Sequence, residues 1–84
     1  MQFLVKVFVT PKPSILDPQG RAIEHSLSSL GFEQVQSVRV GKFITLQLDA
    51  PSADRARDLA SRMCDQLLAN PLIESYEIEL HDTA

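Results

Sequence analysis

The sequence has one cysteine, two histidines and three glycines among its 84 residues. The lone Cys64 forms no internal disulfide, which agrees with a reducing compartment, and its place on an apolar helical stripe predicts a core residue. No two cysteine or histidine residues have the spacing of a metal site, so we expect no bound metal. Gly41 and Lys42 lack the upstream glycine and the hydroxyl residue of a phosphate-binding loop.

Catalytic groups are missing in the same way. The loop between Thr10 and Gly20 has no arginine, and the sole asparagine is Asn70 at a predicted helix end. Acylphosphatase-like enzymes use an arginine in the loop after the first strand and an asparagine later in the chain as catalytic groups. This chain therefore lacks that pair. No serine, cysteine or threonine has a base and an orienting group in a pattern that predicts a nucleophile. We expect no active site in this chain.

Long apolar runs and basic clusters are missing too. The longest apolar stretches are a few residues, well below the roughly 20 that a transmembrane helix needs. Residues 1–6 pass directly into a strand pattern without the features of a signal peptide, so we expect a cytoplasmic protein. The net charge is −3 and the eight basic residues are scattered, which argues against a nucleic-acid partner.

What the sequence does contain is a regular succession of strand and helix patterns. Alternating apolar residues predict strands within residues 3–10 and 73–80. Residues 35–48 predict a hairpin with a two-residue turn at Gly41 and Lys42, although the position of Arg39 leaves its register open. The core face of the first strand is predicted to carry Phe3, Val5, Val7 and Val9.

Two helices separate these strands. Asp17 is a predicted N-cap, Pro18 a first helical residue and Gly31 a left-handed C-terminal residue. A longer helix follows Ser52 and ends near Asn70. The order predicts one domain over residues 1–84 with a ferredoxin-like βαββαβ fold, in which two helices cover one face of a four-stranded antiparallel sheet. Its open face would expose apolar side chains, so we expect self-association through Phe8 and Phe43.

Three segments together carry a resemblance to a known family. They are residues 16–20 (LDPQG), 38–42 (VRVGK) and 69–76 (ANPLIESY). In order and spacing they resemble PurS, the small subunit of phosphoribosylformylglycinamidine (FGAM) synthase, an ATP-dependent ligase of de novo purine synthesis. The resemblance covers nearly the whole chain. Phe43, where many relatives have tyrosine, is a slight departure from the family pattern.

The resemblance implies a non-catalytic assembly subunit. In the family, PurS joins the PurL synthetase to the PurQ glutaminase and supports ammonia transfer from glutamine to formylglycinamide ribonucleotide. It also forms homodimers or homotetramers. ATP, magnesium and glutamine are used by the complex, and no cofactor is expected on this subunit. The resemblance assigns the partner contacts to Asp17, Pro18, Gln19, Gly20, Arg39, Gly41 and Lys42.

Several alternatives stay open at this point. An ACT-like module that binds a small molecule uses the same predicted fold, although the loop after the first strand is rich in proline here. Arg39 and Lys42 form either a small anion-contacting or subunit-contacting pair, or ordinary surface charge. Glycine costs roughly 1 kcal/mol relative to alanine inside a helix, so Gly20 suggests that a partner's backbone approaches closely there. The sequence does not separate PurL contacts from PurQ contacts, dimer from tetramer, or a subunit that lines an ammonia path from one that does not.

Overall fold

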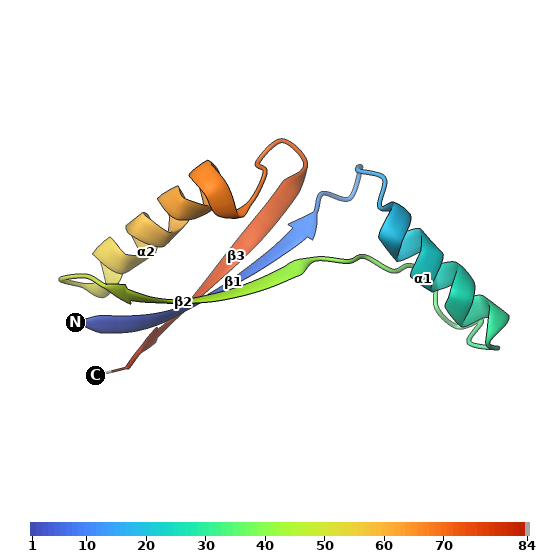
Figure 1. Ribbon diagram of the computed structural model, residues 1–84, viewed down its shortest axis with the longest axis horizontal. Helices are drawn as coiled ribbons and strands as arrows, with labels where there is room; N and C mark the ends of the chain where they lie inside the picture. Colours follow the sequence, from blue (N-terminus) through green and yellow to red (C-terminus); the bar gives the residue numbers. More distant parts are fainter. Residues whose placement is uncertain (84) are drawn as a thin grey trace.

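The computed structural model describes residues 1–83, and its central feature is a three-stranded antiparallel sheet (Figure 1). The strands are β1 (Gln2–Pro11), β2 (Lys42–Asp49) and β3 (Glu74–Asp82), in the order β2-β1-β3. Helix α1 (Pro18–Ser29) lies between β1 and β2 in the chain, and α2 (Ala53–Met63) follows β2. A short π-helix, η1 (Cys64–Leu68), continues α2.

Strand β1 is central, and its register sorts the side chains into two faces. Val7 lies opposite Ile44 of β2 and Ile78 of β3, on the face that packs against α2. Phe8 lies opposite Phe43 on the other face. The predicted core face of β1 is confirmed, because all four of its residues are buried: Phe3, Val5, Val7 and Val9.

Helix α2 reaches this core through small side chains. Ala56, Ala60 and Cys64 are fully buried, so the helix lies close to the strands. The Ser52 hydroxyl accepts the Arg55 N–H at 3.1 Å and caps the helix, as predicted. We call β1, β2, α2, η1 and β3 together the body.

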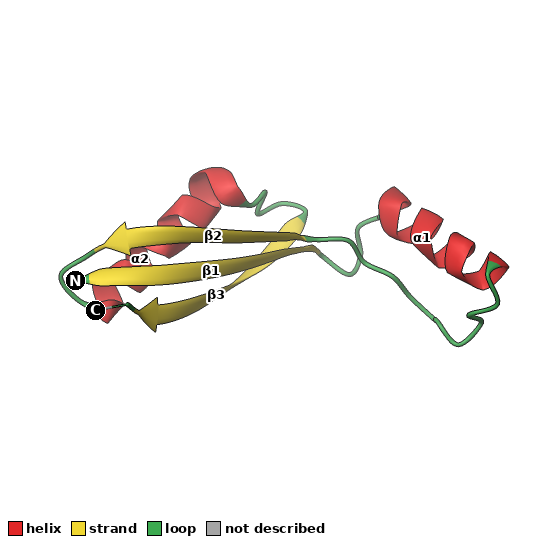
Figure 2. Ribbon diagram, turned by 60° about the horizontal axis from the view of Figure 1, so that its bottom comes forward, coloured by secondary structure: helices red, strands yellow, loops and turns green. Residues whose placement is uncertain are grey.

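The remaining segment, residues 12–41, is the arm, and α1 projects with it beyond the end of the sheet (Figures 1 and 2). Asp17 caps α1 and Pro18 opens it, as predicted. Gly31 has φ +100°, and its N–H donates to the Ser28 carbonyl while the next N–H donates to the Leu27 carbonyl. These two bonds form a Schellman motif that ends the helix.

The predicted four-stranded sheet with both helices on one face is wrong. The sheet has three strands, and α1 lies in the arm instead of beside α2 (Figure 2). The cause lies at Gly41, which has no positive φ and forms no hairpin turn with Lys42. A Cβ there would clash with the Val9 carbonyl, so Gly41 allows close approach to β1. The chain therefore runs straight from the arm into β2.

No helix within residues 1–83 has the length and apolar character needed to span a bilayer.

Candidate functional site

The base of the arm brings together predicted contact residues from two separate segments. One carboxylate oxygen of Asp17 accepts the Gly20 N–H at 2.9 Å, and the other accepts the Val40 N–H at 2.8 Å. The bond from Val40 first, and then the bond from Gly20, holds the pKa of Asp17 below its ordinary value, with a further contribution from the charge of Arg39. Asp17 thus caps α1 and also ties down the chain that returns from it.

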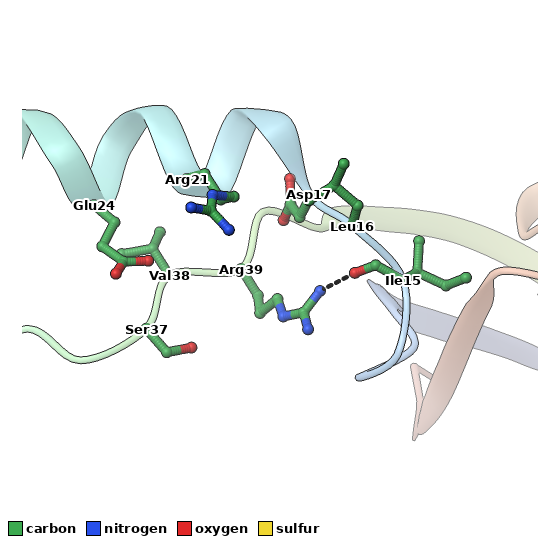
Figure 3. A pocket seen from close by; sticks show the side chains of 8 residues that line it. All are labelled: Ile15, Leu16, Asp17, Arg21, Glu24, Ser37, Val38 and Arg39. Atoms are coloured by element: carbon green, nitrogen blue, oxygen red, sulfur yellow. Dashed lines mark hydrogen bonds between the residues drawn. The ribbon is translucent and has the colours of Figure 1, made fainter.

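Arg39 also holds the base of the arm together. Its guanidinium donates to the carbonyl of Ile15 at 2.6 Å (Figure 3). It also donates to the carbonyl of Pro13 at 2.5 Å. Both acceptors lie in the loop that leads from β1 to α1. Together, Asp17 and Arg39 connect the segment that leads into α1 with the segment that returns from α1 to β2. We call this set of bonds the Asp17–Arg39 junction.

Gly20 belongs to the junction as well. A backbone does approach it closely, as expected, but this backbone is part of the same chain. Gly20 is buried, and a Cβ on it would clash with the Val38 carbonyl and lie 2.8 Å from Oδ2 of Asp17. The glycine is therefore explained by internal packing. The assignment of its surroundings to a partner contact stays a prediction.

Lys42 is directed elsewhere. Its ammonium group donates to the Leu68 carbonyl at 3.2 Å and lies 3.9 Å from a carboxylate oxygen of Glu74. Arg39 and Lys42 therefore engage different parts of the molecule, the arm and the body. The structure does not bring them together as a pair for one anion.

Two hollows flank α1. The first has a volume of about 190 Å³ and is lined by Asp17, Arg21, Glu24 and Arg39 among others, so it carries two arginines and two carboxylates (Figure 3). The second, of about 240 Å³, shares Arg21 and Glu24 with the first. Sites for small-molecule ligands usually measure about 300–1,000 Å³. These hollows suit contacts with protein side chains better than an enclosed substrate.

The open face of the sheet carries the predicted self-association residues. The rings of Phe8 and Phe43 stack with centroids 4.9 Å apart. Phe8 is 38% exposed and Phe43 is 58% exposed. Leu4 and Lys6 lie on the same face of β1, and Glu77 lies opposite Phe8 on β3. An aromatic pair surrounded by charged groups is typical of a protein contact surface.

Sequence reasoning gave no role to a polar group between α2 and β3. The hydroxyl of Tyr76 is 2.9 Å from that of Ser61 and donates to a carboxylate oxygen of Asp65 at 3.0 Å. The bond with Ser61 lowers the pKa of Tyr76, but burial and the Asp65 carboxylate outweigh it and raise the pKa. The phenol therefore stays protonated and fixes α2 to β3. The only sequence signal was its place in the motif at residues 69–76.

The turn before β3 uses the same motif. The Asn70 side-chain oxygen accepts the Leu72 N–H at 3.1 Å, and the Glu74 carboxylate accepts the Asn70 N–H at 2.8 Å. Asparagine before proline thus sets a tight turn from η1 into β3. Cys64, which precedes this turn, is buried in the core as predicted, and burial raises the pKa of its thiol.

The chemistry available in this arrangement is that of protein contacts. Within residues 1–83, no group of three or more His, Cys, Asp or Glu residues is placed to hold a metal ion. Asp17 and Arg39, at the base of the arm, are bound to backbone groups of the same chain. Apolar side chains remain exposed on both the arm and the body.

Comparison with known proteins agrees with these features. The family model PurS, described as phosphoribosylformylglycinamidine (FGAM) synthase, matches residues 4–82. A PurS subunit of this synthase from Synechocystis is 47% identical over 75 residues, which cover 89% of this chain and 75% of that protein. Solved PurS from Thermus thermophilus has a TM-score of 0.84 and 38% identity, and the match covers 100% of both chains.

A second solved structure is that of PurLQS from Thermotoga maritima. One of its chains matches with a TM-score of 0.87 and 30% identity, covering 96% of this chain and 99% of that chain. The match in sequence and that in three dimensions both extend over nearly the full length. The chain therefore belongs to the PurS family of phosphoribosylformylglycinamidine synthase subunits.

Proposed function

We propose that this chain is the assembly subunit of an FGAM synthase, which joins the PurL synthetase to the PurQ glutaminase in purine biosynthesis. The observation that carries this proposal is the full-length match to a chain of the PurLQS structure from Thermotoga maritima. Family membership decides between the two functions that the sequence left open, and it favours the PurS role over the ACT-like module.

The shape of the chain supports a connecting role. The open sheet face with Phe8 and Phe43 lies on the body, whereas Leu16 and Leu30 are exposed on the arm. A chain with two separate apolar surfaces is able to contact more than one neighbour at once. Such a subunit supports ammonia transfer by holding the glutaminase and the synthetase in one complex.

The proposal extends to self-association, ligands and location. The chain forms a homodimer or homotetramer, and the segments around Asp17 and Arg39 contact the large subunits. ATP, magnesium and glutamine bind to those subunits and not to this one. The complex works in the cytoplasm.

The direct test is glutamine-dependent amidine formation by purified PurL and PurQ, with and without this chain. We expect activity only when all three proteins are present. Ammonium chloride in place of glutamine is the matched control, since free ammonia makes the glutaminase unnecessary and should support PurL alone. Full glutamine-dependent activity without this chain, or no binding of this chain to either large subunit, would overturn the proposal.

A further inference from the structure

The two helices of the chain are nearly equal in length but differ in what surrounds them. Helix α1 has 12 residues and α2 has 11. Ala56 and Ala60 of α2 are fully buried, and that helix packs on both β1 and β3. In α1 the buried residue is Gly20, which has no side chain to pack. The body therefore holds α2 in place, whereas α1 lies beyond the end of the sheet (Figure 1).

The sequence of α1 also gives this helix little support of its own. Helix α2 has Asp54 in its first turn and Arg62 in its last, as the helix dipole favours. Helix α1 has no acidic residue in its first turn and no basic residue in its last. Its second half contains four residues that form helices less readily than alanine or leucine: His25, Ser26, Ser28 and Ser29. Isolated helices shorter than about 12–15 residues are marginal in water even when they are rich in alanine.

The bonds that hold the arm act at the two ends of α1. Asp17 caps the first turn, and the Schellman motif at Gly31 closes the last. The Asp17–Arg39 junction acts at the base of the arm. Three large apolar residues of the arm stay exposed, by 40%, 73% and 55%: Ile23, Leu30 and Phe32. A helix in a protein gains most of its stability from packing such an apolar side, so α1 lacks this contribution within its own chain.

We propose that α1 is unfolded for most of the time in a free single chain and folds when the chain enters its assembly, while the body is folded in both states. This coupling deepens the proposed assembly role and rests on it. The free energy of ordering the arm is then subtracted from the free energy of association. The apparent affinity falls by the fraction of free chains whose arm is already folded, so the helix propensity of α1 sets the strength of assembly.

Amide hydrogen exchange of the full chain tests the state of the arm. Sedimentation velocity identifies a dilution at which the chain is a monomer, and mass spectrometry then measures exchange at that dilution. We expect the amides of α1 to exchange within about tenfold of the rate of an unstructured peptide. The amides of β1 should be protected at least about 100-fold more strongly, because they open only when the body unfolds. Protection of α1 should rise when the chain is assembled.

Two substitutions at one position test whether folding and assembly are coupled. His25 is exposed and lies on the side of α1 opposite Ile23, since successive residues are 100° apart around a helix. His25→Ala and His25→Gly both remove the imidazole, so they differ in helix propensity alone. We expect the glycine variant to have a dissociation constant about fivefold higher than the alanine variant for each arm that folds on association. Sedimentation equilibrium measures self-association, and calorimetry measures binding to PurL and PurQ.

Arg57 of α2 provides the matched control. It is exposed in the interior of a helix that stays folded in the free chain as well as in the assembly. Arg57→Gly should therefore lower the unfolding equilibrium of the body about fivefold relative to Arg57→Ala, as glycine does in a helix interior. The two Arg57 variants should nevertheless have equal dissociation constants, because the cost is the same before and after association.

Two results would overturn the coupling. One is a monomer in which α1 is protected as strongly as β1. The other is equal dissociation constants for His25→Gly and His25→Ala, both in self-association and in binding to PurL and PurQ. This second measurement decides alone if the chain stays associated at every dilution. Failure of the proposed function is separate, because it appears as full glutamine-dependent activity of PurL and PurQ without this chain, whatever the state of the arm.

Discussion

The body and the arm differ in what holds them together. In the body, valines of β1 pack against alanines of α2, and these side chains are fully buried. In α1, Gly20 is the buried residue, and the arm is held at its base by Asp17 and Arg39 bonded to backbone groups. One region is therefore stabilised by removing apolar surface from water, and the other by a few directed polar bonds. The two should respond differently to the same kind of change.

The largest effect is expected where the body is most buried. Val7→Asp places an unpaired carboxylate in the core and should destabilise the fold by about 3–5 kcal/mol, a large part of the roughly 5–15 kcal/mol by which a domain is stable. Urea unfolding followed by circular dichroism measures this loss. Thr45→Asp, on the open face, is the control and should change stability by about 0.5 kcal/mol or less. A wild-type unfolding midpoint for Val7→Asp would contradict the account of the core.

The next effect should be confined to the arm. Gly20→Ala forces a Cβ against the Val38 carbonyl, at an overpacking cost of about 1–3 kcal/mol. Amide hydrogen exchange should show faster exchange in α1 and at Val40, with unchanged protection in β1. Gln19→Ala, an exposed neighbour in the same helical turn, serves as the control. Equal loss of protection in α1 and β1 would mean that the arm and the body unfold together.

A smaller effect is expected from the polar group in the body. Tyr76→Phe removes the hydroxyl that bonds to Ser61 and Asp65, a loss of about 1 kcal/mol. For a domain of this size the melting temperature should fall by roughly 4–8 °C. Adding Ser61→Ala to Tyr76→Phe should cost little more, since the partner is already gone. Additive losses would show that the two hydroxyls act independently.

The smallest effect is a change in the arm at low pH. Because the pKa of folded Asp17 is lowered from 3.8 by the Val40 and Gly20 N–H groups, a disordered arm binds more protons than an ordered one. The stabilisation is complete above the ordinary pKa and is lost as the pH falls through the lowered one. The Val40 amide resonance should titrate with a midpoint below 3.8, and Asp17→Asn should abolish that step. A midpoint at or above 3.8 would contradict the bond.

The same contrast explains what the sequence predicted. The two faces of β1 and β3 and both helix starts followed from local patterns, since alternation, an N-cap and proline act within a few residues. Asp17 was interpreted correctly as a cap, but its bond to Val40 joins residues 23 positions apart, and no local pattern shows it. Gly41 was interpreted as a turn residue, and only its packing against β1 shows that it allows a close approach instead.

The placement of α1 was predicted wrongly because it, too, depends on contacts between distant residues. Its apolar stripe predicts a helix that packs on the sheet, and nothing in the stripe says that α1 lies beyond the end of the sheet instead. Among the predicted contact residues, Asp17, Gly20 and Arg39 share the junction. Lys42 instead donates to the Leu68 carbonyl within the body. Phe8 and Phe43 were correctly placed on the open face because strand alternation is a local property.

Seen as a connection between two neighbouring antiparallel strands, the arm is a 30-residue insertion between β1 and β2. Gln2 and Thr83 lie at the opposite end of the sheet from the arm, where the Thr83 N–H donates to the Gln2 carbonyl at 3.1 Å. Figure 1 shows the start of β1 and the end of β3 side by side there. Closing a loop twice as long costs only about 0.6 kcal/mol more. The arm is therefore free to differ in length and sequence at little cost to the body, so the reach of this subunit is adjustable independently of its fold.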